Sequence, residues 1–533
     1  MSRTELEIDG MTCADCATHV RQALEKAGAR EVRIDWRRGA GTIAADGPSQ
    51  IEMNEALAGS RYRVQRVSEP VAGNGLDPER GARDYELVVL GSGSGAFAAA
   101  IRARDLGHRV VLVEHATIGG TCVNVGCIPS KSLLVSSERS GGMAGALAQA
   151  VGVKAELVEQ LRQHKYIDLL GEYGIDYREG QARISDPHTV EVAGQPITAD
   201  AILIATGARP SVPAIDGLEA AGYLTSTSAL ELTEPPRRLA VLGANAVGLE
   251  LGQMLGNFGS HVTFISRRAL TPRSEPEVSQ IIRGVLEDQG HAILEHAHTE
   301  RVAVEGDEKV LRGRRADGEP FEVRADEILL AVGRTPNTEG LGLESLGVGT
   351  DAGGAVVVDE HQRTSVPSIY AAGDVTDQPQ FVYVAAAGGA AAAENALGAG
   401  GQRLDFSNLP RIIFTTPQIA TAGLTESEAR ERGFEVQTSV LGLDAVPRAL
   451  VNREVRGAFK LVAETGSRRL LGASIIAEGA GDVIQSAVLA IGQGMSIDEL
   501  TSTWAPYLTM AEGLKLAAQT FGRDVAKLSC CAA

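Results

Sequence analysis

Hydrophobic residues along this chain gather in short runs that alternate with longer helical patterns. The runs at 85–90, 110–113 and 202–205 are rich in Val, Ile and Leu and have the length of buried parallel strands. An alanine-rich helical pattern follows the first run and reaches about residue 106, and 137–172 also has a helical pattern. Strands that alternate with helices in this way predict an α/β fold built on parallel sheets.

The first strand and helix carry the pattern Gly-x-Gly-x-x-Ala at the turn between them. Gly91, Gly93 and Ala96 occupy its fixed positions. The glycines permit a tight turn and let a pyrophosphate approach the helix N-terminus closely. The next strand ends in Glu114, the acidic position expected to bind a ribose hydroxyl. Because all parts occur in order, we predict a dinucleotide site here.

The pattern returns after a strand predicted at 239–242. Gly243 and Gly248 occupy the outer glycine positions, but Asn245 replaces the middle glycine. Asparagine tolerates a left-handed backbone better than most residues, so we expect the turn to survive the replacement. The segment predicts a second dinucleotide site.

The second site differs from the first at the end of its next strand. The strand predicted at 262–265 is followed by Ser266, Arg267 and Arg268 instead of an acidic residue. Arginines attract a 2′-phosphate, which an acidic residue would repel. We therefore expect this site to prefer NADPH over NADH, although a solvated loop is the alternative role for the two arginines.

Two later segments echo these units. Residues 328–334 repeat the strand-into-glycine pattern of 202–207, and 369–374 predict a strand that ends in Gly-Asp. Asp374 is well placed there to hydrogen-bond the ribityl or phosphate region of a flavin. After about residue 410 the chain has strands and helices but no dinucleotide motif.

The first 68 residues have a different texture. Their short strands and two helical patterns predict a βαββαβ unit with a small ferredoxin-like fold. Cys13 and Cys16 stand where a loop enters the first helix, and a helix N-terminus lowers the pKa of a thiol. Two such sulfurs suit a soft metal ion of low coordination number. A thioredoxin-type redox pair is the alternative, but no βαβ unit of that kind surrounds the cysteines.

The motif around this first cysteine pair is specific. Gly-Met-Thr-Cys-x-x-Cys at 10–16 resembles the heavy-metal-associated domain of copper chaperones and metal-pumping ATPases. Residues 69–84, rich in Gly and Pro, are typical of a flexible linker. A flexible linker would raise the local concentration of a metal carrier near a second site.

Composition limits the classes of function. The chain has 533 residues, 44% of them hydrophobic and 22% charged, which is enough apolar material for several cores. Its net charge of -18 argues against general binding of nucleic acid or of anionic membranes. Because no apolar run is long enough to span a membrane or to act as a signal peptide, we expect a cytoplasmic protein without membrane insertion.

The six cysteines form three pairs: Cys13 with Cys16, Cys122 with Cys127, and Cys530 with Cys531. The middle pair lies beside the first dinucleotide unit, where it can cycle between dithiol and disulfide. A structural or zinc pair is the alternative, but no second pair lies nearby in sequence. The last pair stands near the C-terminus, where free thiols could act as a mobile clamp for a soft metal; an inert tail is the alternative.

Residues 85–533 resemble the flavin-dependent pyridine-nucleotide disulfide oxidoreductases. The resemblance rests on both fingerprints and, above all, on Gly-Gly-Thr-Cys-x-Asn-x-Gly-Cys-x-Pro-Ser-Lys at 119–131. It implies FAD and NADPH as cofactors and a homodimer with active sites at the subunit interface. It also implies that Cys127 lies nearer the flavin and that Cys122 is the outer thiol. Lys131 is expected to stabilise negative charge on the reduced flavin, with an ordinary solvated lysine as the alternative.

The expected organisation follows from these segments. The predicted domains are 1–68 (heavy-metal-associated), 69–84 (linker), 85–234 (FAD, with the dithiol), 235–340 (NADPH), 341–409 (FAD, second part) and 410–533 (dimerisation, with the Cys-Cys tail). The predicted cofactor-binding residues are Gly91, Gly93, Ala96, Glu114, Ala116, Thr121, Lys131, Ala182, Gly207, Asp374, Val382, Gly243, Gly248, Arg267, Arg268 and Arg334.

One departure from the family narrows the function. Members that reduce organic disulfides carry His-Pro-Thr-x-x-Glu near the C-terminus, and the histidine protonates the leaving thiol. The aligned segment here, 507–512, begins with Tyr507, and no histidine follows His361. A metal ion accepts electrons without needing such a proton. Tyr507 and Tyr166, the latter within Leu-Arg-x-x-Lys-Tyr, are expected to flank the metal; a packed helix tyrosine is the alternative for Tyr166.

Together these features predict a family member that reduces Hg(II) to Hg(0) with NADPH in mercury detoxification. Cys13, Cys16, Cys122, Cys127, Cys530 and Cys531 are the expected metal ligands, with the metal passed from the outer pairs to the middle one. Small thiols and a membrane mercury transporter are the expected donors. The alternatives are a disulfide reductase of the dihydrolipoamide dehydrogenase type, and a metal-trafficking protein with a vestigial redox domain, which two intact nucleotide sites disfavour.

Overall fold

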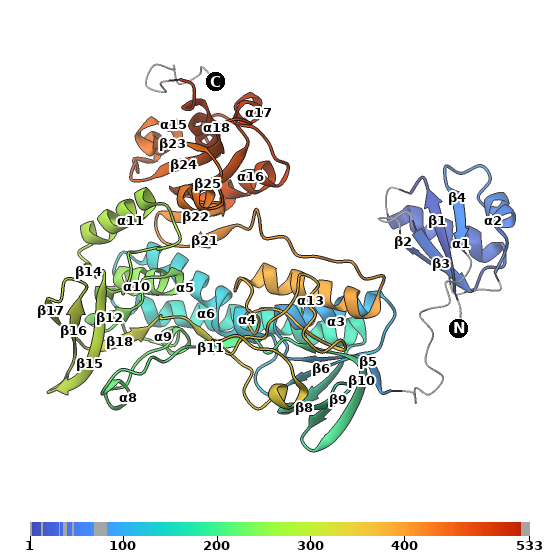
Figure 1. Cartoon of the computed structure of the whole chain (residues 1–533), viewed down its shortest axis with the longest axis horizontal. Helices are drawn as coiled ribbons and strands as arrows, with labels where there is room; N and C mark the ends of the chain where they lie inside the picture. Colours follow the sequence, from blue (N-terminus) through green and yellow to red (C-terminus); the bar gives the residue numbers. More distant parts are fainter. Residues whose placement is uncertain are drawn as a thin grey trace. The chain divides into compact units, whose positions relative to one another are not determined.

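The structure is a computed structural model that describes residues 3–11, 14–30, 32–35, 40–44, 47–68 and 83–523. Its contacts divide the chain into two units, Met1–Arg83 and Asp84–Ala533 (Figure 1). Three of the predicted metal ligands, Cys13, Cys530 and Cys531, lie outside the described residues. Among the described residues, no helix is long and apolar enough to cross a membrane.

The first unit is one antiparallel sheet covered by two helices. Its elements are β1 (Arg3–Asp9), α1 (Ala14–Lys26), β2 (Arg33–Asp35), β3 (Ala40–Ala44), α2 (Gln50–Ala56) and β4 (Arg63–Ser68). The strand order is β2-β3-β1-β4. Val20 and Leu24, one helical turn apart on α1, are fully buried against Met53 of α2 and the sheet.

The second unit begins with a mixed sheet whose central strands are parallel. The order is β7-β6-β5-β10-β9-β8, and β20 pairs with β10. The strands are β5 (Tyr85–Leu90), β6 (Val110–Glu114), β7 (Asp176–Glu179), β8 (Ala182–Asp186), β9 (Thr189–Val192), β10 (Gln195–Ile204) and β20 (Ile369–Ala371). The predicted buried strands are thus confirmed, and β5 and β10 place their carboxyl ends at the same edge.

Two small-residue helices, α3 (Ser94–Asp105) and α13 (Val382–Leu397), pack together against this sheet (Figure 1). Their backbones touch where Gly95 meets Gly389, since a Cβ added at Gly389 would lie 1.9 Å from the Gly95 carbonyl oxygen. Only glycine permits this approach. The contact holds the segment after 369 beside the first dinucleotide loop, although the two segments are far apart in sequence.

Helices form the connection between β6 and β7. They are α4 (Gly120–Val125), α5 (Cys127–Ser140), α6 (Ala146–Arg162), a π-helical turn (Gln163–Ile167) and α7 (Asp168–Tyr173). The sequence predicted helix throughout 137–172, but the structure breaks it at 141–145. Gly141, Gly142 and Gly145 all have positive φ, which ends α5 and starts α6 in a new direction.

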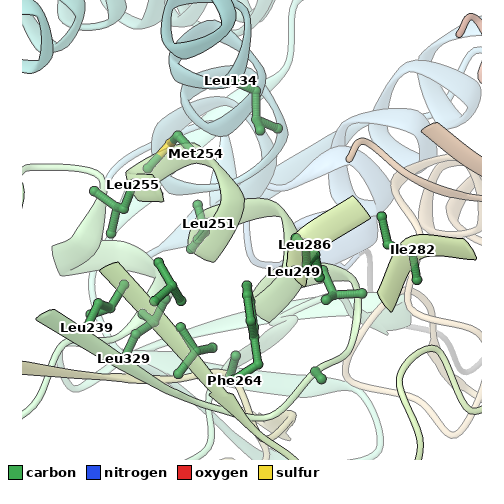
Figure 2. Close-up of a cluster of buried hydrophobic side chains, with 14 of the residues drawn as sticks. Leu134, Leu239, Leu249, Leu251, Met254, Leu255, Phe264, Ile282, Leu286 and Leu329 are labelled. Carbon is green, nitrogen blue, oxygen red and sulfur yellow. The ribbon is translucent and has the colours of Figure 1, made fainter. Parts of the chain in front are cut away.

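A second parallel sheet follows, in the order β14-β13-β12-β18. Its elements are β12 (Arg238–Leu242), α10 (Ala246–Asn257), β13 (His261–Ile265), α11 (Pro276–Asp288), β14 (Ala292–Leu294) and β18 (Glu327–Leu330). Figure 2 shows its core, in which Leu239 and Phe264 of the sheet meet Leu249 and Leu251 of α10. Leu134 of α5 belongs to the same cluster, so the helix that starts at Cys127 is anchored here.

Smaller elements surround this sheet. An antiparallel sheet contains β15 (Ala297–Glu305), β16 (Glu308–Arg315) and β17 (Pro320–Ala325), and β11 (Ala208–Pro210) pairs with β19 (Arg334–Pro336). Single-turn helices are α8 (Leu218–Ala221), α9 (Ser226–Ala229) and α12 (Leu343–Leu346).

The C-terminal part is an antiparallel sheet in the order β21-β22-β25-β24-β23. Its strands are β21 (Arg411–Ile413), β22 (Gln418–Gly423), β23 (Val436–Gly442), β24 (Ala458–Glu464) and β25 (Leu470–Ala477). Its helices are α14 (Glu426–Glu431), α15 (Pro447–Asn452), α16 (Ala480–Gly492), α17 (Ile497–Ser502) and α18 (Glu512–Gln519), with a 3₁₀ turn at Leu443–Ala445. Large apolar side chains stay exposed here, including Trp504 at 97%.

The Gly95–Gly389 contact gives a test of this packing. Gly389→Ala should lower the thermal unfolding midpoint and weaken flavin retention, because overpacking costs about 1–3 kcal/mol. Gly152→Ala is the matched control, since an added Cβ on that face of α6 meets nothing within 4 Å. The control should be neutral or slightly stabilising. Equal unfolding midpoints for the two variants would contradict the contact.

Candidate active site

The first dinucleotide loop is a tight glycine turn that leads into an uncapped helix. Gly91 has φ +109°, and a Cβ there would lie 2.4 Å from the Ala205 carbonyl oxygen. Gly93 precedes α3 with extended backbone and no side-chain cap. The N–H groups of the first turn of α3 therefore remain available to an anion.

An oriented carboxylate stands beside this loop. The Ser92 hydroxyl donates to Glu114 at 2.7 Å, and the backbone N–H of Ala116 donates to its other oxygen at 2.8 Å. The Gly180 N–H bonds the Glu114 carbonyl at 2.8 Å, which brings the predicted residue Ala182 near the end of β6. A fixed acid beside a glycine turn and an open helix N-terminus fits the ribose and pyrophosphate of FAD.

A second polar group closes the same region. Arg334 Nε lies 3.5 Å from Asp374 Oδ2, and its guanidinium donates to the Ala208 carbonyl oxygen. Burial raises the pKa of Asp374, while Arg334 opposes that rise. The buried Arg334 Nε makes no hydrogen bond within the described chain, so this partly buried pair has bonding capacity left for a ligand.

The dithiol spans the junction of two helices instead of lying in one. Cys122 is in α4 and Cys127 is the first residue of α5. Gly126 separates the helices, and a Cβ there would lie 2.8 Å from the Thr121 carbonyl oxygen. Gly120 meets Gly93 backbone to backbone, since its Cβ would lie 2.5 Å from the Gly93 Cα. The dithiol is thus fixed against the FAD loop.

The two sulfurs have opposite acidities. The hydrogen bond from Cys122 lowers the pKa of Cys127 to about 7, burial opposes this, and Lys131 adds to it. Donating that bond, together with burial, raises the pKa of Cys122. In the reduced protein at neutral pH, the thiolate therefore resides on Cys127 and the proton on Cys122.

Lys131 is held by a partner that sequence analysis missed. Its ammonium lies 2.6 Å from Glu250 Oε2 and 4.5 Å from the ring centroid of Phe414. Glu250 Oε1 accepts the Phe414 N–H at 2.9 Å. A glutamate in a largely apolar helical pattern, two residues after Gly248, was the available sequence signal.

Tyr166 lies in the π-helical turn and faces the dithiol. Its ring packs edge-on against Phe97 at 4.9 Å between centroids. Burial raises the pKa of Tyr166, the nearby Cys122 adds to the rise, and a hydrogen bond with Ser94 opposes it. The extra residue of a π turn redirects the side chains that follow it, and such turns recur at functional sites.

A hydrogen-bonded pair that sequence analysis missed, Arg162 and Asn124, connects this π-helical turn to α4, the helix that carries Cys122. Arg162, the last residue of α6, donates to Asn124 Oδ1 at 3.1 Å. The Asn124 amide donates to the carbonyl oxygens of Ile118 and Gly120, both at 2.9 Å. The sequence motif contains Asn124 but does not reveal its role, because the hydrogen bond with Arg162 connects α4 to α6.

Tyr507 lies elsewhere, between α17 and α18, and is 49% exposed. The next residue, Leu508, has φ +59°, and its N–H reaches the buried Glu512 carboxylate at 3.3 Å. This turn presents Tyr507 on the surface of the C-terminal part. Within one chain, Tyr166 therefore lies close enough to Cys122 to be influenced by it, and Tyr507 belongs to the C-terminal part.

The second fingerprint opens on a cavity of about 750 Å³. Gly243 has φ +104° and no space for a Cβ, as the sequence predicts. The turn survives the replacement by Asn245, as predicted, but the expected left-handed backbone was wrong, because the φ of Asn245 is -91° and its ψ is -173°. Asn245 instead caps α10: its side chain accepts the Gly248 N–H at 3.2 Å and donates to Ala331 at 2.7 Å.

Four arginines line this cavity, one of them being Arg411 of β21. Arg267 and Arg268 are the predicted pair, and Arg273 joins them from the following loop. Sequence analysis missed Arg273 because it stands beyond the strand end, where no motif placed it. A cavity of this size, lined by Gly243 and four guanidinium groups, fits NADPH and its 2′-phosphate.

Comparison with known proteins agrees with this geometry. The chain matches the family described as pyridine nucleotide-disulphide oxidoreductase over residues 85–389, and that family's dimerisation domain over 409–518. A mercuric reductase of Staphylococcus aureus is 46% identical over 99% of both chains. One from Streptomyces lividans is 50% identical over 84% of this chain and 98% of its own.

The chain belongs to the mercuric reductase family of pyridine nucleotide-disulphide oxidoreductases. The predicted α/β fold of 85–533 is thereby confirmed, as are FAD and NADPH, the cofactors of these enzymes. The antiparallel C-terminal sheet is the dimerisation domain of this mercuric reductase family member.

A solved structure shows the same architecture. The HOCl-induced flavoprotein disulfide reductase RclA from Escherichia coli superposes with a TM-score of 0.75 and 32% identity. The superposition covers 82% of this chain and 99% of RclA. A Cu(II) complex of RclA is equally similar, with a TM-score of 0.74.

Lys131 and Glu250 shift the pKa of Cys127 in opposite directions, so substitution of each should have the opposite effect. Lys131→Met should raise the pKa of Cys127 above about 7, and Glu250→Gln should lower it, because the two groups act in opposite directions. The pH dependence of thiol alkylation in the reduced protein measures both shifts. A shift in the same direction for both variants would contradict the arrangement.

Proposed function

We propose that this chain reduces Hg(II) to Hg(0) with electrons from NADPH, through the dithiol Cys122–Cys127. The observation that carries the proposal is a dithiol beside a nucleotide site in a chain that has Tyr507 in place of the family's histidine and no histidine after His361. The relatives described as mercuric reductases support it. Mercury detoxification is the corresponding role.

The balanced reaction takes two electrons from one NADPH and gives Hg(0), NADP⁺ and one proton. FAD, when bound, supplies the route by which a hydride from NADPH becomes an electron pair at the dithiol. Gly91, Gly93, Glu114 and Asp374 would hold FAD, and Gly243 with the arginines of the 267–273 loop would hold NADPH.

The thiols themselves prepare the site for the metal. Cys127 is a thiolate near neutral pH and can displace a ligand from Hg(II) directly. Cys122 releases its proton as it binds, and solvent can take up that proton. Tyr166 stands beside Cys122, where a phenol oxygen can stabilise the metal during exchange. No group has to protonate a departing thiol, which accounts for the missing histidine.

Delivery of the metal involves the outer cysteine pairs. The first unit has the strand order of a ferredoxin-like heavy-metal-associated domain, and its Cys16 is buried at 2% exposure. Arg61 Nη2 donates to the Cys16 sulfur at 3.1 Å, which favours the thiolate. Hg(II) would pass from this pair to Cys530 and Cys531 of the partner subunit, and then to the dithiol between Tyr166 and the partner's Tyr507.

The proposed donors are small thiols and a membrane mercury transporter. The proposed active site lies at the subunit interface, which agrees with the exposed apolar side chains of the dimerisation domain. Disulfide reduction, the activity in RclA's description, is the second candidate, and that protein's Cu(II) complex makes Cu(II) a second metal to test.

The dithiol is tested directly by removing each sulfur. Cys122→Ala and Cys127→Ala should each lower Hg(II)-dependent NADPH oxidation by at least about 100-fold, the order of loss typical for an essential group. Cys16→Ala is the control and should retain turnover with mercury supplied as a small thiol complex. Oxidised glutathione, lipoamide and Cu(II) serve as competing substrates. Retained Hg(II) turnover in both dithiol variants would overturn the proposal.

The two outer pairs should differ in their effect on turnover. Ending the chain at Lys527 should impair reduction of mercury complexed by bulky thiols, because the C-terminal pair then no longer removes it from its carrier. Deleting residues 1–68 should leave turnover nearly unchanged with excess small thiol, since that unit only delivers metal. Complete loss of activity after the N-terminal deletion would contradict this division of roles.

A further inference from the structure

A buried lysine joins the dimerisation domain to the second nucleotide site. Lys460 lies on β24, and its side chain is only 5% exposed. Its ammonium contacts three carboxylates: Glu275 at 3.0 Å, Glu277 at 3.0 Å and Glu426 at 3.1 Å. None of these four residues lines the NADPH cavity. Moving these charged groups out of water carries a desolvation cost, which their mutual attraction offsets only when the geometry is good. Such a cluster therefore fixes the orientation of its members.

Glu275 is the member that connects the cluster to the cavity. Its side chain is 3% exposed, and it immediately precedes α11. Its Oε1 accepts the backbone N–H of Glu426 at 2.7 Å, and its carbonyl oxygen accepts the Val278 N–H at 3.0 Å. Glu275 is thus fixed by the dimerisation domain on one side and by the first turn of α11 on the other.

The loop between β13 and α11 carries Arg267, Arg268 and Arg273, and it ends at Glu275. Thr271, in the middle of the loop, is buried with φ +45°, and its hydroxyl lies 2.8 Å from that of Ser279. Arg273 lies between Thr271 and Glu275, and both Arg273 and Ser274 line the cavity. The backbone around Arg273 is therefore held at Thr271 and at Glu275, and the hold at Glu275 depends on Lys460.

The positive charge of Lys460 is needed to keep the Glu275 carboxylate in its buried position. Burial lowers the pKa of Lys460, but hydrogen bonds with the three carboxylates outweigh burial and raise it, so the lysine stays charged. Without its charge, three carboxylates would repel one another, and Glu275 would be buried without a counter-charge. Glu275 would then turn outward or take up a proton, and the loop would lose its anchor.

We propose that Lys460 is a positioning residue for recognition of the NADPH 2′-phosphate, acting through Glu275 on Arg273. The inference rests on the proposed NADPH-dependent function and deepens it. It makes the dimerisation domain a determinant of which nicotinamide nucleotide is bound. The residue itself does not touch the nucleotide cavity, so its effect must appear as a change in selectivity.

A purely structural lysine would behave differently. Its loss would lower stability and weaken both nucleotides equally, because NAD⁺ and NADP⁺ share every group except the 2′-phosphate. A positioning residue for the phosphate should weaken NADP⁺ alone. The ratio of the two affinities separates these roles, whatever the change in stability.

The experiment uses the full-length FAD-loaded protein and measures NADP⁺ and NAD⁺ binding by calorimetry. Lys460→Met should weaken NADP⁺ about tenfold and change NAD⁺ by less than about twofold, since a well-placed charged contact is worth roughly that factor. In steady state, KM for NADPH should rise while kcat stays constant. Lys309→Met is the matched control, because Lys309 is also paired, at 2.6 Å to Glu327, but far from the arginine loop in sequence.

Two further variants keep the test decisive. Glu275→Gln retains an acceptor for the Glu426 N–H but loses the charge, so it should also lower the NADP⁺ to NAD⁺ affinity ratio. In an Arg273→Met background, Lys460→Met should no longer change that ratio. Equal weakening of both nucleotides, or an unchanged effect without Arg273, would overturn the inference. A wild-type protein that binds NAD⁺ as well as NADP⁺ would instead refute the proposed NADPH dependence.

Discussion

The contact between Gly120 and Gly93 is the constraint on which the active site depends. A Cβ at Gly120 would lie 2.5 Å from the Gly93 Cα. The backbone of α4, which carries Cys122, therefore touches the backbone of the first dinucleotide loop. Neither chain segment can move away, because α3 is locked to α13 through Gly95 and Gly389, and α5 is anchored by Leu134. The dithiol is therefore placed by backbone packing before any side chain acts, and the acidity of its sulfurs follows from that placement.

The chemistry of the site depends on a single shared proton. Cys122 keeps it and Cys127 is left as the thiolate, with Lys131 nearby and Glu250 limiting the effect of that lysine. Such a site offers a nucleophilic sulfur at neutral pH, while Tyr507 stands where disulfide-reducing members of the family carry a histidine acid. A disulfide substrate would need the acid and a thiol-bound metal ion would not, which joins the acidity of the dithiol to Tyr507 in the histidine's place.

Much of this architecture could be predicted from the sequence. The strands and both glycine loops follow from local patterns, and the structure confirms them because backbone sterics require glycine at those turns. Glu114 ends β6, the position at which the pattern expected an acid. Sequence analysis missed Glu250, Asn124, Arg162 and Lys460, because each contacts a segment distant in sequence. It missed Arg273 because that residue stands beyond the end of the strand. Asn245 shows the limit of local reasoning: the residue was expected to supply a backbone conformation, but it supplies a cap through its side chain.

The most direct measurement of the central claim is the yield of Hg(0) per NADPH consumed, with mercury supplied as a complex with excess small thiol. Volatile mercury can be trapped and counted while NADPH absorbance falls. The balanced reaction predicts one Hg(0) for each NADPH oxidised, with the two thiols that carried each mercury ion released unchanged. NADPH oxidation without Hg(0), or faster turnover with an organic disulfide than with Hg(II), would contradict the account.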